Sequence, residues 1–312
     1  MTRVRPSVVV MAMILATLVA PNDTAAQESR PTFTSQAELV VLHVTVKDRR
    51  GAYVTDLPKD AFTVFEDERP NSISVFTAVD SPVTVGLIID SSGSMRDGRN
   101  HVLAAATAFA AASHPQDDLF AVTFNENVRD VLPPMMPFTS DASVLQAALE
   151  RTIRAYGRTA LYDAILRGLT YVEGGRHPRR VLVLVADGGD NASDTTFEQV
   201  LREAQASNAA VYAVGVVDPL DGNANQGRLR ELARATGGEA FFPRKVEDVA
   251  DVLRHIAEEI RHTYTLGFVP PDRRQDGAFH RLRVEVRAPD RRALSVRTRE
   301  GYRASFVRTR SQ

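Results

Sequence analysis

The chain has 312 residues, of which 44% are hydrophobic and 25% are charged, the ordinary balance of a globular protein. Its formal net charge of -1 provides no overall field that would attract nucleic acid or an anionic membrane. Cysteine is absent from the sequence, which excludes disulfides, thiolate metal sites and a cysteine nucleophile.

The first residues have the pattern of an export signal. Arg3 and Arg5 form a basic start, an apolar run covers 7–20, and Thr24–Ala26 offers small residues for cleavage. The run has roughly 14 residues, whereas a helix needs about 20 to span a bilayer; the alternative is a retained membrane anchor. We expect residues 1–26 to be a cleaved signal peptide, the mature chain to have no membrane span, and the protein to be periplasmic or secreted.

Residues 33–80 show a β pattern. Apolar and polar residues alternate in "AELVVLHVTVKD", and a turn follows at "RRG". The stretch "AFTVFEDERPNSISVFTAV" predicts a hairpin with its turn at Glu66–Pro70. Pro82 marks the end of this N-terminal β segment.

From residue 83 to residue 261 the pattern changes to strands that alternate with helices. Strands are expected at Val83–Ile89 and in "DLFAVTFN", "VRDVLPPM", "RRVLVLVAD", "AAVYAVGVV" and "EAFFP". Helices are expected at Arg99–Ser113, Asp141–Ile153, Ala160–Val172, Phe197–Ser207, Arg228–Thr236 and Val246–Ile260. This alternation predicts an α/β fold with a doubly wound, mostly parallel sheet flanked by helices.

Residues 262–304 return to a β pattern. Three strands are expected in "YTLGFVP", "HRLRVEVRAP" and "RALSVRTREG", with turns at Asp276–Gly277 and Asp290. Two β segments that flank an α/β region suggest that 33–80 and 262–304 pair into one β-sandwich-like domain, into which the α/β domain is inserted. Residues 305–312 are expected to be a frayed tail.

Polar side chains gather where strands of the predicted sheet end. Asp90, Ser92 and Ser94 follow the first strand. Thr159 opens the helix in "GRTALYDAI", and Asp187 ends the strand "RRVLVLVAD". Ligands of open parallel sheets bind at the carboxyl ends of the strands, and the first and fourth strands can lie side by side, so these groups can meet. Two carboxylates and three hydroxyls suit Mg²⁺ or Mn²⁺ and do not suit a soft metal.

The sequence "DSSGSM" resembles the D-x-S-x-S motif of the von Willebrand factor type A (VWA) domain. "GRTALYDA" resembles the threonine loop of that family, and "ADGGD" resembles its second aspartate segment. The resemblance covers roughly 83–261 and fills all five positions of the metal-ion-dependent adhesion site. The two β segments are similar, less specifically, to the flanks of bacterial exported proteins with this domain. Ala186 stands where many relatives have threonine or serine, but it is not one of the five positions.

The resemblance implies a mechanism. Ser92, Ser94 and Thr159 would be direct or near-direct ligands of the metal, and Asp90 and Asp187 would often act through water. Neutral hydroxyls leave the ion electrophilic, and a coordination place left open could take an aspartate or glutamate of a partner protein. The implied function is a non-enzymatic protein-binding or adhesion module.

Several alternatives stay open. D-x-S-x-S can by itself form a turn and a helix cap, and Asp163 can be either an ordinary helix carboxylate or a group that supports the ligands. The protein could be a structural or assembly scaffold of the cell envelope in which the metal only stabilises loops. A hydrolase is a further alternative, although the sequence has no G-x-S-x-G. "DGGDNASDTTFE" imitates an EF-hand loop, but Gly189 and Ala192 occupy positions where that loop needs a ligand and a glycine.

Overall fold

The computed structural model describes residues 39–78, 80–216, 225–271, 277–288 and 293–304. The expected signal peptide, the turn residues Asp276 and Asp290, and the expected tail lie outside the described residues. None of the helices within the described ranges combines the length and the apolar character that crossing a lipid bilayer requires.

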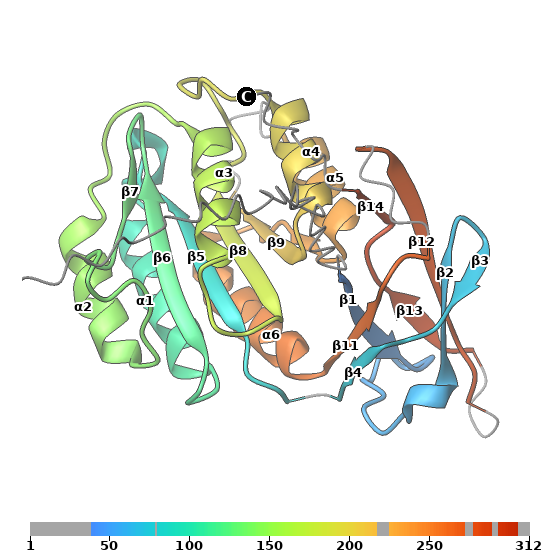
Figure 1. The fold of residues 1–312 in the computed structure, drawn as a ribbon. Coiled ribbons are helices and arrows are strands. Elements are labelled where there is room, and N and C mark those ends of the chain that lie inside the picture. Colours follow the sequence, from blue (N-terminus) through green and yellow to red (C-terminus); the bar gives the residue numbers. More distant parts are fainter. Residues whose placement is uncertain (1–38, 79, 217–224, 272–276, 289–292, 305–312) are drawn as a thin grey trace, which may run out of the picture. The chain divides into compact units, whose positions relative to one another are not determined.

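A six-stranded sheet lies at the centre of the α/β region, in the order β10-β9-β8-β5-β6-β7 (Figure 1). All neighbouring strands are parallel except β7, which is antiparallel to β6. The predicted α/β fold with a mostly parallel sheet is therefore confirmed, and β5 and β8, the first and fourth strands, are neighbours. The strands are β5 (Thr84–Asp90), β6 (Asp118–Phe124), β7 (Val128–Asp130), β8 (Arg180–Ala186), β9 (Ala209–Gly215) and β10 (Ala240–Phe241).

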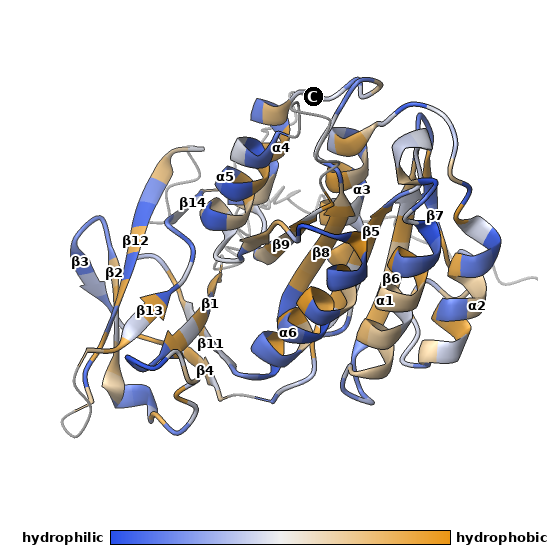
Figure 2. Cartoon of the chain, turned by 180° about the vertical axis from the view of Figure 1, so that it is seen from behind, coloured by the Kyte–Doolittle hydropathy of each residue, from blue (hydrophilic) through white to orange (hydrophobic). Residues whose placement is uncertain are grey.

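Helices cover both faces of this sheet (Figure 1). One face carries α1 (Arg99–Ala111), α2 (Ala142–Thr152) and α6 (Val249–Arg261), and the other carries α3 (Leu161–Val172), α4 (Phe197–Ala206) and α5 (Gln226–Thr236). Figure 2 shows hydrophobic residues along the central strands and hydrophilic residues on the helices. Because both faces are covered, β5, β6 and β9 are buried along their whole length, which explains their continuous apolar sequences.

The ends of the elements differ from the predicted ones for local reasons. The carboxylate of Asp141 accepts hydrogen bonds from two N–H groups of the first turn of α2, so the helix begins after it. Gly237 ends α5 with a left-handed φ of 85°. The helix predicted from Val246 begins as a 3-10 turn, η3 (Val246–Asp248). The strand predicted in "VRDVLPPM" is only β7, because Pro133 and Pro134 have no N–H for a ladder.

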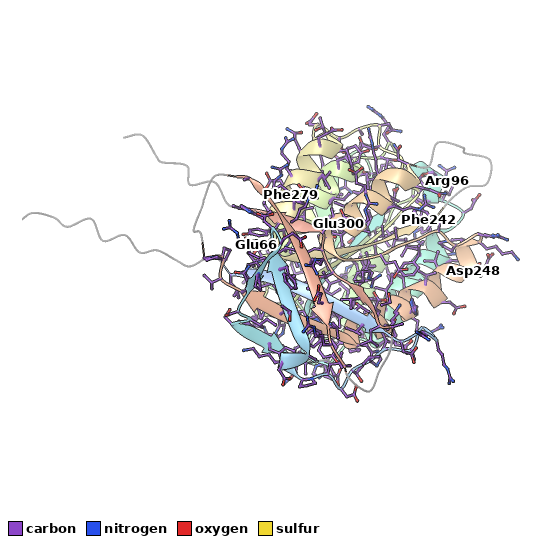
Figure 3. All side chains as sticks on the ribbon, turned by 90° about the vertical axis from the view of Figure 1, so that its right-hand side faces the viewer. Glu66, Arg96, Phe242, Asp248, Phe279 and Glu300 are labelled. Atoms are coloured by element: carbon purple, nitrogen blue, oxygen red, sulfur yellow. The ribbon has the colours of Figure 1, made fainter. Side chains whose placement is uncertain are left out.

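Both ends of the chain contribute two strands to each of two further sheets, with the orders β13-β1-β11-β4 and β14-β12-β2-β3. One hydrophobic cluster contains residues of both sheets, among them Leu42, Val64, Tyr264 and Val284. Figure 3 faces these sheets and labels Glu66 of β2 and Phe279 of β12. The elements are β1 (Val40–Lys47), η1 (Lys59–Ala61), β2 (Phe62–Glu66), β3 (Arg69–Asn71), β4 (Val75–Thr77), β11 (Thr263–Phe268), β12 (Phe279–Val286), β13 (Ser295–Arg297) and β14 (Gly301–Arg303).

The hairpin predicted in "AFTVFEDERPNSISVFTAV" is only partly right. β2 and β3 pair around Asp67 and Glu68, which both have left-handed φ values, 46° and 64°. Pro70 cannot donate to a ladder, so β3 stays short and lies at the edge of its sheet. The rest of the stretch leaves the hairpin, and β4 pairs with β11 in the other sheet.

The single strand predicted in "RALSVRTREG" is wrong, because the chain changes sheets there. β13 pairs with β1, whereas β14 pairs with β12. Arg299 lies between them and is buried. Its guanidinium donates to the carbonyl oxygens of Gly301 at 2.8 Å, Ser207 at 2.9 Å and Gln205 at 2.5 Å, and these contacts hold the chain at the crossing.

A buried histidine on β1 predicts a pH dependence of stability. His43 is 5% exposed, and its Nε2 lies 3.1 Å from the carbonyl oxygen of Asn208. Burial, together with the positive charge of Arg179, lowers the pKa of His43 from 6.5 to about 3. The unfolded chain therefore takes up a proton below pH 6.5 that the folded protein does not take up until about pH 3, so stability falls as the pH drops from 6.5.

We expect His43→Gln to remove this part of the pH dependence. The difference in free energy of unfolding between parent and variant should change by about 2 kcal/mol between pH 7 and pH 5, at about 1.4 kcal/mol per pH unit below 6.5. Urea denaturation at the two pH values measures it, with the exposed His101→Gln as the control. Equal pH profiles for the parent and His43→Gln would contradict the expectation.

Candidate metal centre

The candidate site lies where β5 and β8 end, side by side in the central sheet (Figure 1). Asp90 is the last residue of β5, Ser94 lies in the 3-10 turn η2 (Gly93–Met95), and Asp187 directly follows β8. Thr159 lies two residues before α3. The sheet thus brings the ends of two neighbouring strands, with their polar loops, to one edge.

Four of the five predicted site residues form one continuous series of hydrogen bonds. The Ser92 N–H donates to Asp90 Oδ1 at 2.7 Å. The Oγ atoms of Ser92 and Ser94 lie 2.9 Å apart, and Ser94 Oγ donates to Asp187 Oδ2 at 2.6 Å. Ser92 precedes η2, but its side chain makes no capping bond to that turn. The hydroxyls therefore contact each other and the second aspartate, which a simple turn-and-cap role does not require.

Thr159, the fifth residue, is linked to this group through its backbone. Its N–H donates to Asn191 Oδ1 at 2.9 Å, and its carbonyl oxygen accepts from the N–H groups of Asn191 at 3.0 Å and Ala192 at 3.1 Å. The Gly93 N–H donates to the carbonyl oxygen of Gly157 at 3.1 Å. The threonine loop is therefore bonded both to the loop after β5 and to the loop after β8.

Asp90 has an unsatisfied carboxylate oxygen. The residue is 2% exposed, and its Oδ2 has no hydrogen-bond partner among the described residues. Burial raises the pKa of Asp90 to about 7. The negative charge of Asp187 also raises this pKa, whereas the hydrogen bond from Ser92 lowers it. A buried carboxylate oxygen without a partner is costly, and a cation at this position would satisfy it. Carboxylate and hydroxyl oxygens are ligands that suit Mg²⁺ or Mn²⁺.

No group of three or more histidine, aspartate or glutamate side chains within the described ranges is placed to hold a metal. The candidate set at the ends of β5 and β8 is of a different kind, because three of its five members are serine or threonine. The residues present therefore fit a hard divalent cation through mixed carboxylate and hydroxyl oxygens.

Asp163, whose role the sequence left open, holds the loop that follows β8. Its two carboxylate oxygens accept from the N–H groups of Asp194 and Thr195, each at 3.0 Å. It is thus an anchor of that loop on α3. Sequence reasoning missed Asn191 and Glu126, whose carboxylate accepts from an N–H of the threonine loop at 2.8 Å. Polar residues in loops are common, so neither position carried a signal.

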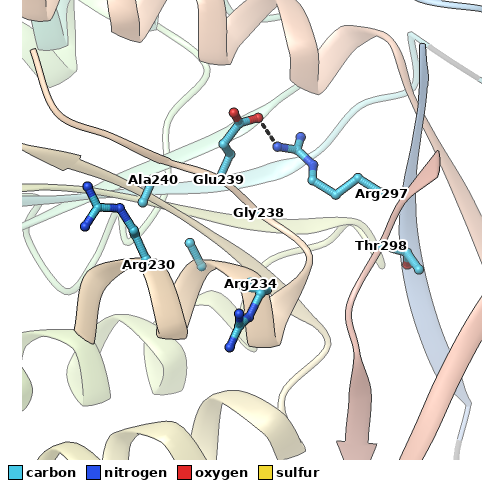
Figure 4. Close-up of a pocket in the computed structure, with 8 residues that line it drawn as sticks. Arg230, Arg234, Gly238, Glu239, Ala240, Arg297 and Thr298 are labelled. Carbon is cyan, nitrogen blue, oxygen red and sulfur yellow. Dashed lines mark hydrogen bonds and ion pairs between the residues drawn. The ribbon is translucent and has the colours of Figure 1, made fainter. Parts of the chain in front are cut away.

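A cavity of about 240 Å³ lies elsewhere, between α5 and the segment after β13 (Figure 4). Three arginines line it, but protein groups engage each of them. Arg297 pairs with Glu239, and Arg234 Nε lies 3.0 Å from a carboxylate oxygen of Glu300. The Arg230 guanidinium lies 4.2 Å from the centre of a phenylalanine ring. We assign no ligand to this cavity.

The model of the von Willebrand factor type A domain matches residues 85–259, more than half of the chain. Among solved structures, a von Willebrand factor type A protein from Catenulispora acidiphila is 14% identical, with a TM-score of 0.49 over 89% of this chain and 76% of that chain. The vWF domain of the type V pili tip protein Mfa5 from Porphyromonas gingivalis is 13% identical, with a TM-score of 0.48 over 59% of this chain and 96% of that chain. BatB from Bacteroides thetaiotaomicron is 18% identical, with a TM-score of 0.45 over 57% of this chain and 97% of that chain. No curated protein matches the chain. The motif order, the α/β fold and the match to the domain model lead to one conclusion: the chain belongs to the von Willebrand factor type A domain family.

Proposed function

We propose that the protein is an exported, non-enzymatic binding or adhesion module that docks a carboxylate of a protein partner at a metal-ion-dependent adhesion site. VWA domains are commonly protein-interaction or adhesion modules and are generally not enzymes. The observation that carries the proposal is the buried, unpartnered Oδ2 of Asp90 beside the hydrogen-bonded serines. The proposed site residues are Asp90, Ser92, Ser94, Thr159 and Asp187.

The contacts of these residues suit the proposed roles. Ser94 Oγ donates its one hydrogen bond to Asp187 and therefore accepts from Ser92 Oγ, which leaves one of its two lone pairs available to a cation. The Ser92 N–H occupies Oδ1 of Asp90 and leaves Oδ2 available. When bound, Mg²⁺ or Mn²⁺ would supply an electrophilic centre for the partner's carboxylate.

The scaffold alternative, in which metal only stabilises loops, has less support. Hydrogen bonds already join the three loops without an ion, between Gly93 and Gly157 and between Thr159 and Asn191. A metal is therefore not needed to hold the loops together, so a role in binding accounts better for the polar set. The export assignment rests on the sequence pattern of residues 1–26.

We also propose that the two four-stranded sheets form a β-sandwich that supports the α/β domain. Three observations favour it: each sheet takes strands from both ends of the chain, the sheets share a hydrophobic cluster, and the rings of Phe62 and Tyr264, from different sheets, lie 4.9 Å apart. Neither β segment has enough strands to cover its own edges.

Partner capture tests the proposed function. Immobilised parent protein in Mg²⁺ is expected to retain a partner from an extracytoplasmic extract, and both the chelated parent and Thr159→Ala are expected to lose it. The expected cost is a few kcal/mol, that of an unmade charge-assisted contact at a desolvated site. Circular dichroism should remain native in all three samples. Undiminished capture by both the chelated parent and Thr159→Ala would refute docking at the metal. If the samples that lose capture also lose the native spectrum, the result would favour the scaffold alternative.

A further inference from the structure

One side chain fixes the backbone of Thr159 from the loop that follows β8. Asn191 Oδ1 accepts from the Thr159 N–H at 2.9 Å, and the Asn191 N–H donates to the Thr159 carbonyl oxygen at 3.0 Å. Asn191 therefore forms hydrogen bonds with the peptide groups on both sides of the Thr159 Cα. This Cα carries the hydroxyl that the proposed site uses.

The other contacts of the threonine loop hold its neighbours. Gly157 accepts from Gly93, Ala160 donates to the carbonyl oxygen of Asn125 at 2.7 Å, and the Arg158 N–H donates to the Glu126 carboxylate at 2.8 Å. Among the side chains in these contacts, that of Asn191 bonds Thr159 itself. Asn191 also lies four residues after Asp187, so its contact ties the position of the threonine to the loop of the second aspartate.

We infer that Asn191 is a positioning residue of the metal centre: by holding Thr159 against the loop of Asp187 it sets the affinity of the site for a divalent cation. This inference rests on the proposed function. The chemistry needs a side-chain acceptor at this position, which asparagine and aspartate supply and which alanine and leucine lack. Groups that orient metal ligands typically change metal affinity by about 10–100-fold when they are removed.

Calorimetric titration of the full chain with Mg²⁺ tests the inference. Asn191→Ala and Asn191→Leu should both bind Mg²⁺ about 10–100-fold more weakly than the parent. Asn191→Asp should bind Mg²⁺ no more than about threefold more weakly than the parent, because its carboxylate accepts the same hydrogen bond from the Thr159 N–H. Asn127→Ala removes another exposed asparagine, from the β6–β7 turn, and should leave Mg²⁺ affinity unchanged.

Melting temperatures in chelator separate positioning from folding. Asn191 is exposed, so Asn191→Ala and Asn191→Leu should melt close to the parent without metal. Parent-like Mg²⁺ affinity in Asn191→Ala, or an equal loss in Asn191→Asp, would overturn the inference. The same titration of Asp90→Ala shows whether a negative result refutes the proposed metal site or only the role of Asn191. If Asp90→Ala binds Mg²⁺ as the parent does, the proposed site itself fails, whereas loss in Asp90→Ala with unchanged Asn191→Ala refutes only the role of Asn191.

Discussion

Replacing Glu259 by alanine is expected to lower the free energy of unfolding by about 3–5 kcal/mol. Glu259 lies on α6 and is 0% exposed. Its carboxylate pairs with Arg297 of β13, lies 3.1 Å from Lys47 Nζ of β1, and accepts from Tyr212 Oη at 2.8 Å. Alanine would leave Arg297 and Lys47, whose side chains are only partly exposed, without this counter-charge.

The neighbouring Glu258→Ala provides the matched control, because Glu258 is exposed on the same turn of α6. We expect it to change the free energy of unfolding by no more than about 0.5 kcal/mol in urea denaturation. The network around Glu259 joins the α/β region to the sheet β13-β1-β11-β4. If Glu259→Ala and Glu258→Ala unfold at the same urea concentration, the ion pairs of Glu259 do not contribute to stability.

Asp90→Asn is expected to abolish stabilisation by metal without destabilising the metal-free protein. At a Mg²⁺ concentration of about 100 times Kd, a single site adds about 2.7 kcal/mol of stability, or about 4 °C in Tm for a chain of this size. Asparagine keeps the acceptor for the Ser92 N–H but removes a buried charge next to Asp187. In chelator, Asp90→Asn should therefore melt no lower than the parent.

Thermal unfolding with Mg²⁺ and with chelator measures both effects. Asp97→Asn removes an exposed carboxylate close by in sequence, and it should keep the full shift produced by Mg²⁺. A parent-sized shift in Asp90→Asn would show that the stabilising ion binds elsewhere. A much lower Tm in chelator would mean that the Asp90 carboxylate has a structural role of its own.

The sequence predicted well what depends on local pattern. Continuous apolar runs identified β5 and β8, because a strand that helices cover on both faces needs no polar positions. Helical spacing placed α3 and α4 to within one residue at each end. The sequence could not show where β13 ends and β14 begins. Alternation of apolar and polar residues indicates a strand but not which sheet the strand joins.

Contacts between distant parts of the chain could not be predicted from the sequence either. Glu259 has the sequence context of an ordinary charged residue on an amphipathic helix, and its partners Lys47 and Arg297 are far away along the chain. Asn191 is a polar loop residue whose bonds to Thr159 exist only once β8 lies beside β5. The candidate ligands could be proposed from the sequence, because they follow strand ends, but the residues that contact them from distant loops could not.

An anomalous difference map from crystals grown with Mn²⁺ tests the metal centre most directly. The account predicts one strong peak at the carboxyl ends of β5 and β8, in contact with the hydroxyl oxygens of Ser92 and Ser94 and next to Oδ2 of Asp90. The peak should be missing from crystals of Asp90→Ala grown under the same conditions. A map from the parent protein with no peak at this place, or with its strongest peak at another group of side chains, would contradict the account.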